Sequence, residues 1–322
     1  MQLALPAAVR AQSCRTTMSS SATWVLIGYF LLYATVVVAF VVWRRISRQD
    51  RKPFPDHLKL LRGPGETQRR LVAALDENLY QTLVVASLPP LLVAAALVSL
   101  ALRLPPPALW FALTGTLGVF LAVLFLVARW LVAKITERQN RDLGCFGERV
   151  VAEFLEPLKT QGCRVFHDVP CGDAKSPFNI DHVVVGPGGV FAIETKTRRK
   201  GRSREGFAAH EIIYDGQVLA YPWGEDRHGL DQAQRQARWL EDTLASLLGR
   251  RTPVRPILTF PGWMIIRRGS GAVNVLNPRE IPAAVAPALG SSPGPRGVSA
   301  LDARECDLIA RQLDARCRDV EY

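Results

Sequence analysis

Patterns that bind zinc are missing from this chain. Its six cysteines form no C-x-x-C pair, and no cluster of Cys and His has the spacing of a zinc site. A zinc-stabilised fold is therefore excluded. Cys163 and Cys171 could bridge in principle, but in a cytoplasmic domain all six cysteines should stay free thiols with structural roles.

A phosphate-binding loop is also missing. Gly186-Pro187-Gly188-Gly189 is rich in glycine, but no Gly-Lys-Ser/Thr follows it and no helix is expected to open there. Proline presets φ and glycine permits positive φ, so this segment is predicted to form a tight turn. The sequence therefore gives no indication of a P-loop nucleotide site.

Acidic residues are scarce in the first part of the chain. Residues 1–134 hold 14 Lys and Arg but 5 Asp and Glu, whereas residues 135–322 hold 26 and 24. Most of the net charge of +11 therefore belongs to the N-terminal part, where basic residues collect on the cytoplasmic side of a membrane. The basic composition alone does not indicate DNA binding.

Long apolar runs dominate that N-terminal part. Residues 23–43 carry no charge and are long enough to span a bilayer. Residues 83–102 and 108–133 are joined by a proline-rich connector, which favours a helical hairpin in the membrane. The alternative is a buried hairpin in a soluble protein.

Flanking charge predicts the orientation of these runs. Residues 44–82 contain nine Lys and Arg, whereas the connector 103–107 contains Arg103 alone. The positive-inside rule places 44–82 and everything after 134 in the cytoplasm, with the N-terminus outside. Met18, which leads into the first run, is an alternative start to Met1. The expected divisions are a tail (1–22), a transmembrane helix (23–43), a basic cytoplasmic connector (44–82), a transmembrane hairpin (83–133, as 83–102 and 108–133) and a cytoplasmic domain (135–322, core 144–266).

Helical and strand patterns alternate in the polar part. Apolar residues at helical spacing predict helices, and runs of β-branched and aromatic residues predict strands. The predicted helices cover 146–158, 230–248 and 301–317, and the predicted strands cover 163–169, 183–185, 190–193, 212–214, 218–221, 256–260, 262–266 and 273–276. This order indicates a mixed α/β domain.

Asp181 and Glu194 flank a predicted β-hairpin. With the turn centred on Pro187-Gly188, the numbers of paired residues sum to 375, so Asp181 lies opposite Glu194. Lys196 shares the face of Glu194 because side chains alternate along a strand. A one-residue slip would move every side chain to the other face.

Two opposed carboxylates need an offsetting charge. Directly opposed Cβ atoms lie about 5 Å apart, where like charges are destabilising. A divalent cation would offset this cost because hard cations bind carboxylate oxygens. Two carboxylates and an ammonium on one sheet face favour a metal-dependent hydrolase acting on phosphodiesters. The alternative is a charged, solvated hairpin surface.

Four segments of the chain share residues and spacing with a known family. They are Gly147-Glu148-Arg149-Val150-Val151, Asn179-Ile180-Asp181-His182-Val183-Val184-Val185-Gly186, Gly189-Val190-Phe191-Ala192-Ile193-Glu194-Thr195-Lys196 and, more weakly, Gln232-Ala233-Gln234-Arg235-Gln236-Ala237. The region from Gly147 to about Leu248 thus resembles the nuclease-related domain (NERD) of many bacterial proteins. That family is similar to the restriction-endonuclease-like fold, whose site is written PD-(D/E)xK. The resemblance implies an α/β fold with a mixed sheet flanked by helices, here preceded by three transmembrane helices.

The resemblance also implies roles for individual residues. Asp181 and Glu194 would be metal ligands, Lys196 the catalytic lysine, Glu148 an accessory acid and Gln232 a supporting helix residue. The metal would be Mg²⁺ or Mn²⁺, which polarises the scissile phosphate and lowers the pKa of a bound water. The family often has Asn-Pro shortly before the glutamine, a feature that this chain lacks.

These roles imply a nuclease, with DNA as the favoured nucleic acid, anchored in a bacterial inner membrane with its C-terminal domain in the cytoplasm. The lipid bilayer would be a second partner, and the fold class favours a homodimer. Lys196 could act as general base or stabilise developing negative charge, and the second role is favoured because it needs no pKa shift. Two alternatives stay open: a non-catalytic module that binds nucleic acid or senses a ligand at the membrane, and a membrane scaffold.

Basic residues crowd the segment directly after the predicted site, where six of them fill nine positions from Lys196 to Arg204. Phosphate contacts and a solvated or membrane-facing loop explain them equally well. His182 follows Asp181 and should point to the opposite sheet face, in a packed or hydrogen-bonded role. The other histidines of the domain have no partner at ligand spacing. Three tryptophans are expected in the core or an interface rather than as base-stacking platforms: Trp223, Trp239 and Trp263.

Overall fold

The fold is described from a computed structural model of the chain. The structure describes residues 58–101, 105–173, 175–202, 205, 208–285 and 301–321, with isolated residues between 28 and 43. The chain forms two compact units. The first consists of Met1–Pro53 and Ala73–Arg138, and the second of Phe54–Val72 and Gln139–Tyr322.

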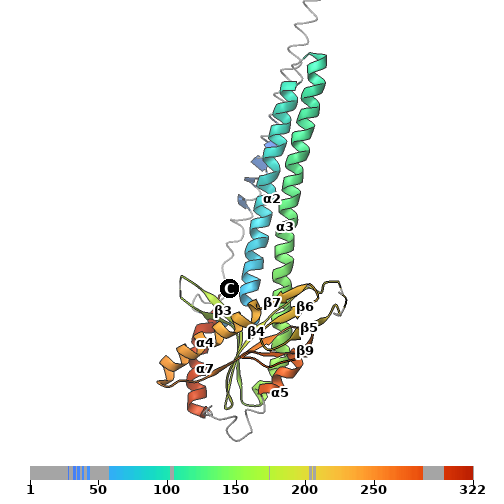
Figure 1. The fold of residues 1–322 in the computed structure, drawn as a ribbon. Coiled ribbons are helices and arrows are strands. Elements are labelled where there is room, and N and C mark those ends of the chain that lie inside the picture. The colour runs from blue at the N-terminus through green and yellow to red at the C-terminus, as the bar shows by residue number, and fades with distance from the viewer. Residues whose placement is uncertain are drawn as a thin grey trace, which may run out of the picture. The chain divides into compact units, whose positions relative to one another are not determined.

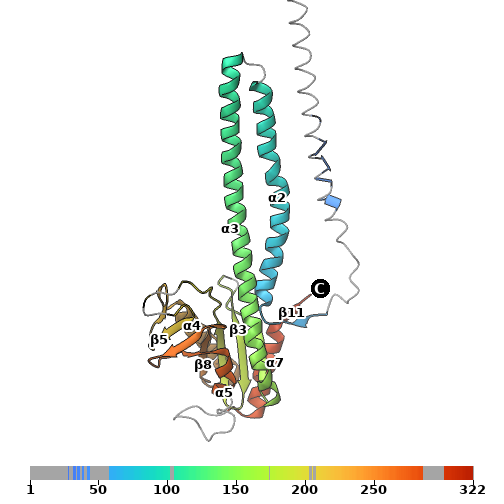
Figure 2. The ribbon, with the colours of Figure 1, turned by 90° about the vertical axis from the view of Figure 1, so that its right-hand side faces the viewer.

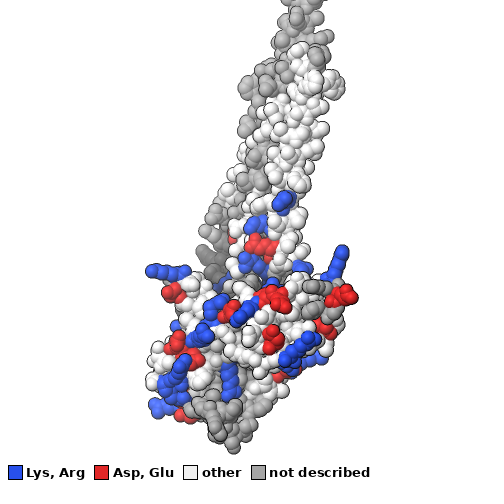
Figure 3. All heavy atoms as spheres, viewed as in Figure 1, with Lys and Arg blue, Asp and Glu red and all other residues white. Residues whose placement is uncertain are grey.

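The described part of the first unit is helical. Stretches of α2 (Glu66–Ala101) and α3 (Pro106–Thr160) lie side by side in it (Figures 1 and 2), and the Arg138 guanidinium of α3 pairs with the Asp76 carboxylate of α2. Figure 3 shows no Lys, Arg, Asp or Glu along the upper length of these helices, in line with the apolar runs of the sequence.

Of the three predicted membrane spans, the described residues support one. The helix Ala108–Thr160 is long and apolar enough to cross a bilayer, judged by length and composition. The run 83–102 forms the second half of α2, whose first half is polar, and many of its side chains lie outside the described residues. Most of the run 23–43 also lies outside them. Within the described residues, one candidate helix thus stands in place of the three expected spans.

The second unit is a mixed α/β domain, as the element order predicts. Its main sheet has the strand order β10-β8-β4-β3-β2. The β2–β3 and β3–β4 pairs are antiparallel, whereas β8 runs parallel to β4 and β10 parallel to β8. The strands are β2 (Arg164–Cys171), β3 (Phe178–Gly186), β4 (Gly189–Thr195), β8 (Val254–Thr259) and β10 (Asn274–Leu276).

Helices cover both faces of this sheet (Figures 1 and 2). Leu240 and Leu244 of α4 and Leu313 of α7 belong to the core on one face, whereas Leu155 and Leu158 of α3 belong to the core on the other. Fully burying a leucine side chain stabilises a fold by about 1.5–3 kcal/mol. The covering helices are α4 (His228–Leu248), α7 (Ala303–Cys317) and α5 (Ile281–Val285), which follows the short η1 (Pro278–Glu280).

A second sheet, of order β7-β6-β5-β9, lies beside the main sheet. Its members are β5 (Glu211–Tyr214), β6 (Leu219–Tyr221), β7 (Gly224–Asp226) and β9 (Met264–Arg267). The strands predicted at 212–214 and 218–221 correspond to β5 and β6, which pair antiparallel. The strand predicted at 262–266 corresponds to β9, which pairs with β5 in this second sheet, but it is not buried as its apolar residues suggest, since Met264 is 53% exposed. An apolar run alone does not say which sheet a strand joins.

Part of the predicted connector 44–82 belongs to the second unit. Leu60–Leu61 (β1) pairs antiparallel with Arg318–Val320 (β11) near the C-terminus. Arg62 then donates to both oxygens of the Asp319 carboxylate, at 2.7 and 2.6 Å. The segment before α2 is therefore fixed to the α/β domain by backbone pairing and by charge.

The hairpin between β3 and β4 has the predicted register. Gly186 pairs with Gly189 and His182 with Ile193, which leaves Pro187-Gly188 as the turn. The next residues outward from the His182–Ile193 pair are Asp181 and Glu194. The sequence therefore placed both carboxylates correctly along their strands.

We expect Leu155→Ala to lower the free energy of unfolding by about 2–5 kcal/mol, because it leaves a cavity in a core where Leu155 is fully buried. Phe146→Ala on the same helix is the control. The helical pattern predicts Phe146 on the apolar face, but α3 turns it outward and it is 63% exposed. Denaturant titration of the full chain in detergent measures both, and equal losses for the two variants would contradict the packing.

Candidate active site

The end of β4 holds a lysine–carboxylate pair. Lys196 Nζ lies 2.6 Å from Glu194 Oε1 and donates to Gln232 Oε1 at 2.7 Å. The Glu194 side chain is 2% exposed, whereas that of Lys196 is 21% exposed. β4 is a central strand, and the pair at its end joins a buried carboxylate to an ammonium that is partly exposed to solvent. The structure thus joins three of the predicted site residues.

Asp181 lies on the neighbouring strand β3. Its Oδ2 accepts a hydrogen bond from the Thr195 backbone N–H at 2.7 Å, so the carboxylate reaches across to the end of β4. Burial raises the pKa of Asp181 well above its usual range, and the charges of Glu194 and Glu148 raise it further. Asp181 is therefore electrostatically coupled to both other predicted acids.

Glu148 approaches from α3 and is 6% exposed. Burial raises its pKa to about 8, the charges of Asp168 and Glu194 act in the same direction, and a hydrogen bond from the Gly65 backbone opposes them. Its Oε2 is buried and has no hydrogen-bond partner among the described residues. The oxygen without a hydrogen-bond partner thus belongs to a carboxyl group that interacts electrostatically with Glu194 and Asp181.

Gly147 explains how α3 comes so close to the end of β4. A Cβ at this position would lie 2.4 Å from Thr197 Cγ2, which is too close for any real contact. Glycine is therefore needed where the helix meets the segment that follows Lys196. The glycine precedes Glu148, so the same close approach brings the glutamate toward the site.

Gln236 is a site residue that the sequence analysis did not select. Its Nε2 donates to Glu194 Oε2 at 2.6 Å and to the Asn179 carbonyl at 2.9 Å. It follows Gln232 by one helical turn, so both amides lie on the same side of α4. That i, i+4 spacing was the available signal, and it would have paired Gln236 with the same site.

Asp168 is a second residue that the sequence analysis missed. It lies in β2 with φ +49°, a conformation that non-glycine residues seldom adopt, and it is 2% exposed. Its carboxylate accepts from Arg62 Nη1 at 3.0 Å, from the Thr67 N–H at 2.9 Å and from Asn179 Nδ2 at 2.9 Å. Asp168 therefore ties the segment before α2 to Asn179 of β3, which lies two residues before Asp181.

His182 takes the packed, hydrogen-bonded position that the alternation of β3 predicts. It is fully buried, and its Nδ1 lies 2.8 Å from Nδ1 of His167, its cross-strand partner. Burial lowers the pKa of His167 to about 4 and that of His182 well below its usual range. The sequence offers His167 no partner at metal-ligand spacing, and its hydrogen-bond partner comes from the neighbouring strand.

The electrostatics of the acids bear on the predicted divalent cation. Asp181 and Glu148 lie in each other's field and in that of Glu194, and the buried Glu148 Oε2 lacks a donor. A cation would favour their charged forms. No cluster of three or more His, Cys, Asp or Glu side chains in the described part of the chain is already arranged to hold a metal. Asp181 and Glu194, with Glu148 near them, remain the predicted ligand set.

The basic segment after Lys196 folds back over the domain. Arg198 Nη2 bonds Asp226 Oδ2 at 2.9 Å, and Arg199 Nε bonds Asn140 Oδ1 at 3.2 Å. Arg198, Arg199, Lys200 and Arg202 are exposed. Arg204 lies outside the described residues.

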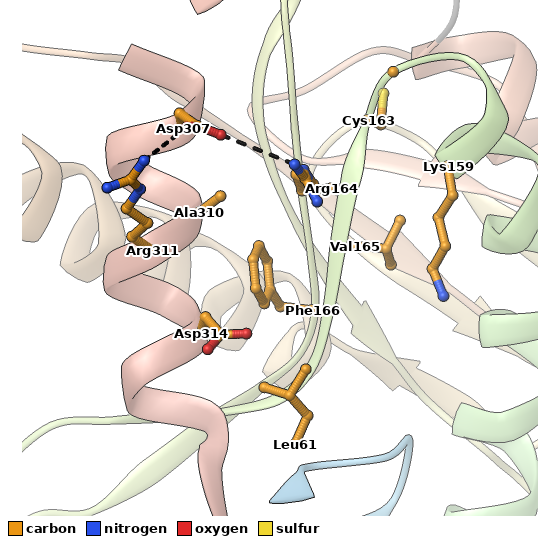
Figure 4. Close-up of a pocket in the computed structure, with 11 residues that line it drawn as sticks. Leu61, Lys159, Cys163, Arg164, Val165, Phe166, Asp307, Ala310, Arg311 and Asp314 are labelled. Carbon is orange, nitrogen blue, oxygen red and sulfur yellow. Dashed lines mark hydrogen bonds and ion pairs between the residues drawn. The ribbon is translucent and has the colours of Figure 1, made fainter. Parts of the chain in front are cut away.

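A cavity of about 680 Å³ lies elsewhere in the same unit, at the start of β2 and against α7. Figure 4 shows Phe166 pointing into it and Arg164 paired with Asp307 at its edge. None of the predicted site residues lines it. This cavity is therefore separate from the acids and the lysine, which lie near the end of the central strand β4.

Fold and site together define a mixed α/β domain whose central sheet ends in buried acids, a lysine and two supporting glutamines. Residues 143–261 match the family described as the nuclease-related domain, NERD. The matched region contains all four segments that carry the resemblance in the sequence, so the family match supports that resemblance. No curated protein and no solved structure matches the chain.

The raised pKa of Glu148 predicts a pH-dependent stability. A carboxyl group with pKa 4.5 when unfolded and about 8 when folded favours the folded state fully below pH 4.5, and this contribution is lost as the pH rises through 8. Glu148→Gln cannot ionise. In metal-free buffer it should gain stability relative to the native protein between pH 5 and pH 8.5, as measured by denaturant midpoints.

Glu153→Gln provides the matched control, since Glu153 is an exposed glutamate on the same helix. Its midpoint should follow that of the native protein at both pH values. A Glu148→Gln variant whose advantage stays constant across this range would show that Glu148 ionises normally in the folded domain.

Proposed function

We propose that this protein is a membrane-anchored, metal-dependent nuclease that hydrolyses phosphodiester bonds of nucleic acid, with DNA as its substrate. The nuclease-related domain at residues 143–261 supports a nuclease-related function. The observation that carries the proposal is the contact of Lys196 Nζ with Glu194 Oε1 at 2.6 Å beside the coupled acids Asp181 and Glu148.

The restriction-endonuclease-like architecture is part of this proposal. Its support is a mixed sheet in which Asp181 lies within β3, and Glu194 and Thr195 end the neighbouring strand β4 directly before Lys196, as in a PD-(D/E)xK site. α3 brings Glu148 toward the site from the face opposite to α4, which supplies Gln232 and Gln236. Sequence spacing and strand register therefore point to the same assignment.

Asp181 and Glu194 would hold Mg²⁺ or Mn²⁺. When bound, the ion would polarise the scissile phosphate and lower the pKa of a water. Both oxygens of Glu194 already accept hydrogen bonds, one from Lys196 and one from Gln236. Each carboxylate oxygen has a second acceptor position, so these bonds orient Glu194 without excluding a cation.

Lys196 would stabilise negative charge that develops on the phosphate. Its ammonium is fixed by two acceptors, Glu194 Oε1 and Gln232 Oε1, so it meets the substrate without reorganising. A positioned positive charge of this kind needs no proton transfer to or from the lysine. Gln232 and Gln236 are positioning residues, since they act through Lys196 and Glu194.

The membrane anchor is proposed from α3. The apolar window of Ala108–Thr160 has none of its residues buried within the chain, and Phe111 and Phe125 are 82% and 66% exposed. Large apolar side chains exposed in such numbers favour a lipid environment. Basic residues after position 134 favour a cytoplasmic location for the α/β domain at a bacterial inner membrane.

Supercoiled plasmid nicking tests the hydrolytic function. The full chain in detergent with Mg²⁺ or Mn²⁺ should nick the plasmid, and chelation should stop it. Glu194→Gln and Lys196→Ala should each lower the rate by about 100-fold or more, by analogy with loss of one preorganised charge-stabilising group.

The matched controls come from a second lysine–glutamate pair. Lys159 Nζ lies 2.6 Å from Glu156 Oε1 on the exposed end of α3, at the same distance as the site pair. Glu156→Gln and Lys159→Ala should retain full nicking activity. Activity that survives in Glu194→Gln and Lys196→Ala would refute the assigned site.

A non-catalytic binding module is the second candidate, favoured by the observation that both Glu194 oxygens are engaged within the chain. Calorimetric titration with Mn²⁺ separates the two. The nuclease proposal expects binding that is lost in Asp181→Asn but kept in Asp173→Asn, an exposed aspartate outside the site. A module without a metal site would show no heat that depends on Asp181.

Alkaline carbonate extraction tests the anchor. A chain that spans the bilayer stays in the membrane pellet, whereas a protein bound by surface charge is released. We expect the full chain to remain in the pellet after carbonate and after high salt. Release by carbonate would contradict the membrane span while leaving the nuclease site untouched.

A further inference from the structure

An exposed tryptophan stands in the second sheet, close to the candidate site. Trp223 lies between β6 and β7 and is 50% exposed. Its aromatic neighbours are buried: Tyr221 is 3% exposed and Trp263 2% exposed. The sequence predicts a core or interface position for both tryptophans, and Trp263 lies in the core, whereas Trp223 is exposed.

The Trp223 ring is held in a fixed orientation. It stacks on Tyr221 with ring centroids 5.2 Å apart and an interplanar angle of 12°, and its edge meets Trp263 at 5.6 Å. Aromatic contacts of this geometry stabilise a pair beyond the area that they bury. A rigid, half-exposed aromatic ring loses little conformational freedom when a flat ligand stacks on it.

A basic segment of the chain passes beside the aromatic cluster. Arg198 lies over the Tyr221 ring at 5.9 Å from its centroid, and Gly201 passes so close to Trp223 that a Cβ there would lie 3.0 Å from Cε3. Arg199, Lys200 and Arg202 of the same segment are exposed. Exposed guanidinium and ammonium groups beside an aromatic ring suit a ligand that is both flat and anionic.

The same segment connects the aromatic ring to the candidate active site. Trp263 Nε1 donates to the Arg198 carbonyl at 3.2 Å, and Arg198 follows Lys196 by two residues. Two residues of extended chain span at most about 7 Å. The aromatic cluster therefore contacts the chain two residues after the lysine that the proposed function places on the scissile phosphate.

We infer that Trp223 stacks an unpaired base of the substrate strand next to the scissile phosphate, while Arg198, Arg199 and Lys200 contact the backbone phosphates. Stacking on aromatic rings in a basic groove is how proteins bind single strands without sequence preference, because every base has a π-face. In an intact duplex the bases are paired and stacked on one another. The inferred substrate, which rests on the proposed function, is thus single-stranded or locally unpaired DNA.

Binding measured without cleavage tests this inference. Full-length protein in detergent with EDTA is titrated into a fluorescein-labelled single-stranded DNA oligonucleotide and, separately, into a blunt duplex of the same sequence, with anisotropy as the readout. Trp223→Ala should weaken single-strand binding by about 10-fold, because one stacked base is lost. Duplex binding should change by less than about 2-fold, since phosphate contacts remain.

Two further variants make the result specific. Trp223→Phe keeps an aromatic face and should keep single-strand affinity within about 3-fold of the native protein. Met264→Ala removes an equally exposed apolar side chain from the same sheet and should bind both DNAs as the native protein does. Wild-type single-strand affinity in Trp223→Ala, or an equal loss on single strand and duplex, would overturn the inference.

The outcome is separable from that of the proposed hydrolysis. A selective loss in Trp223→Ala together with no cleavage under any metal would support the stacking surface and refute the nuclease. Metal-dependent nicking together with unchanged single-strand affinity in Trp223→Ala would support the nuclease and refute the stacking surface.

Discussion

The site of this domain depends on the interaction of the Lys196 ammonium with the acids around it. Three acids lie near one another at the end of the central strands: Asp181, Glu194 and Glu148. The repulsion between their negative charges raises the pKa values of Asp181 and Glu148. Lys196 contacts Glu194 directly and lowers the pKa of the other two. Removing either partner of a buried ion pair leaves an uncompensated charge. Loss of Lys196 would therefore disturb the acids and the strands β3 and β4 that carry Asp181 and Glu194.

Long-range contacts complete the arrangement around that pair. Gln236 fixes the second oxygen of Glu194 and also holds the backbone of Asn179, and the side chain of Asn179 bonds Asp168. Asp168 in turn accepts from Arg62, which lies before α2 and also pairs with Asp319 near the C-terminus. The segment that leads into α2 is thus linked by hydrogen bonds to the strand that carries Asp181.

Sequence reasoning succeeded where the contacts are local. A two-residue turn at Pro187-Gly188 fixed the register of β3 and β4 and hence the positions of Asp181 and Glu194. It failed for Arg62 and Asp168, whose contact spans 106 residues and follows no periodic pattern. It also failed for Phe146. Helical spacing predicts which residues share one face of a helix, but not where along the helix other elements begin to pack against that face. The resemblance to the nuclease-related domain could be predicted from motif spacing, whereas the exposure of Trp223 depends on how the second sheet packs.

Anomalous diffraction from crystals grown with Mn²⁺ tests the central claim most directly, because it locates the ion without assuming any activity. The account predicts one anomalous peak about 2.0–2.2 Å from oxygens of both Asp181 and Glu194, with Lys196 still paired to Glu194. Carboxylates that point to different sides of the sheet, or a manganese peak bound only to residues outside β3 and β4, would contradict it.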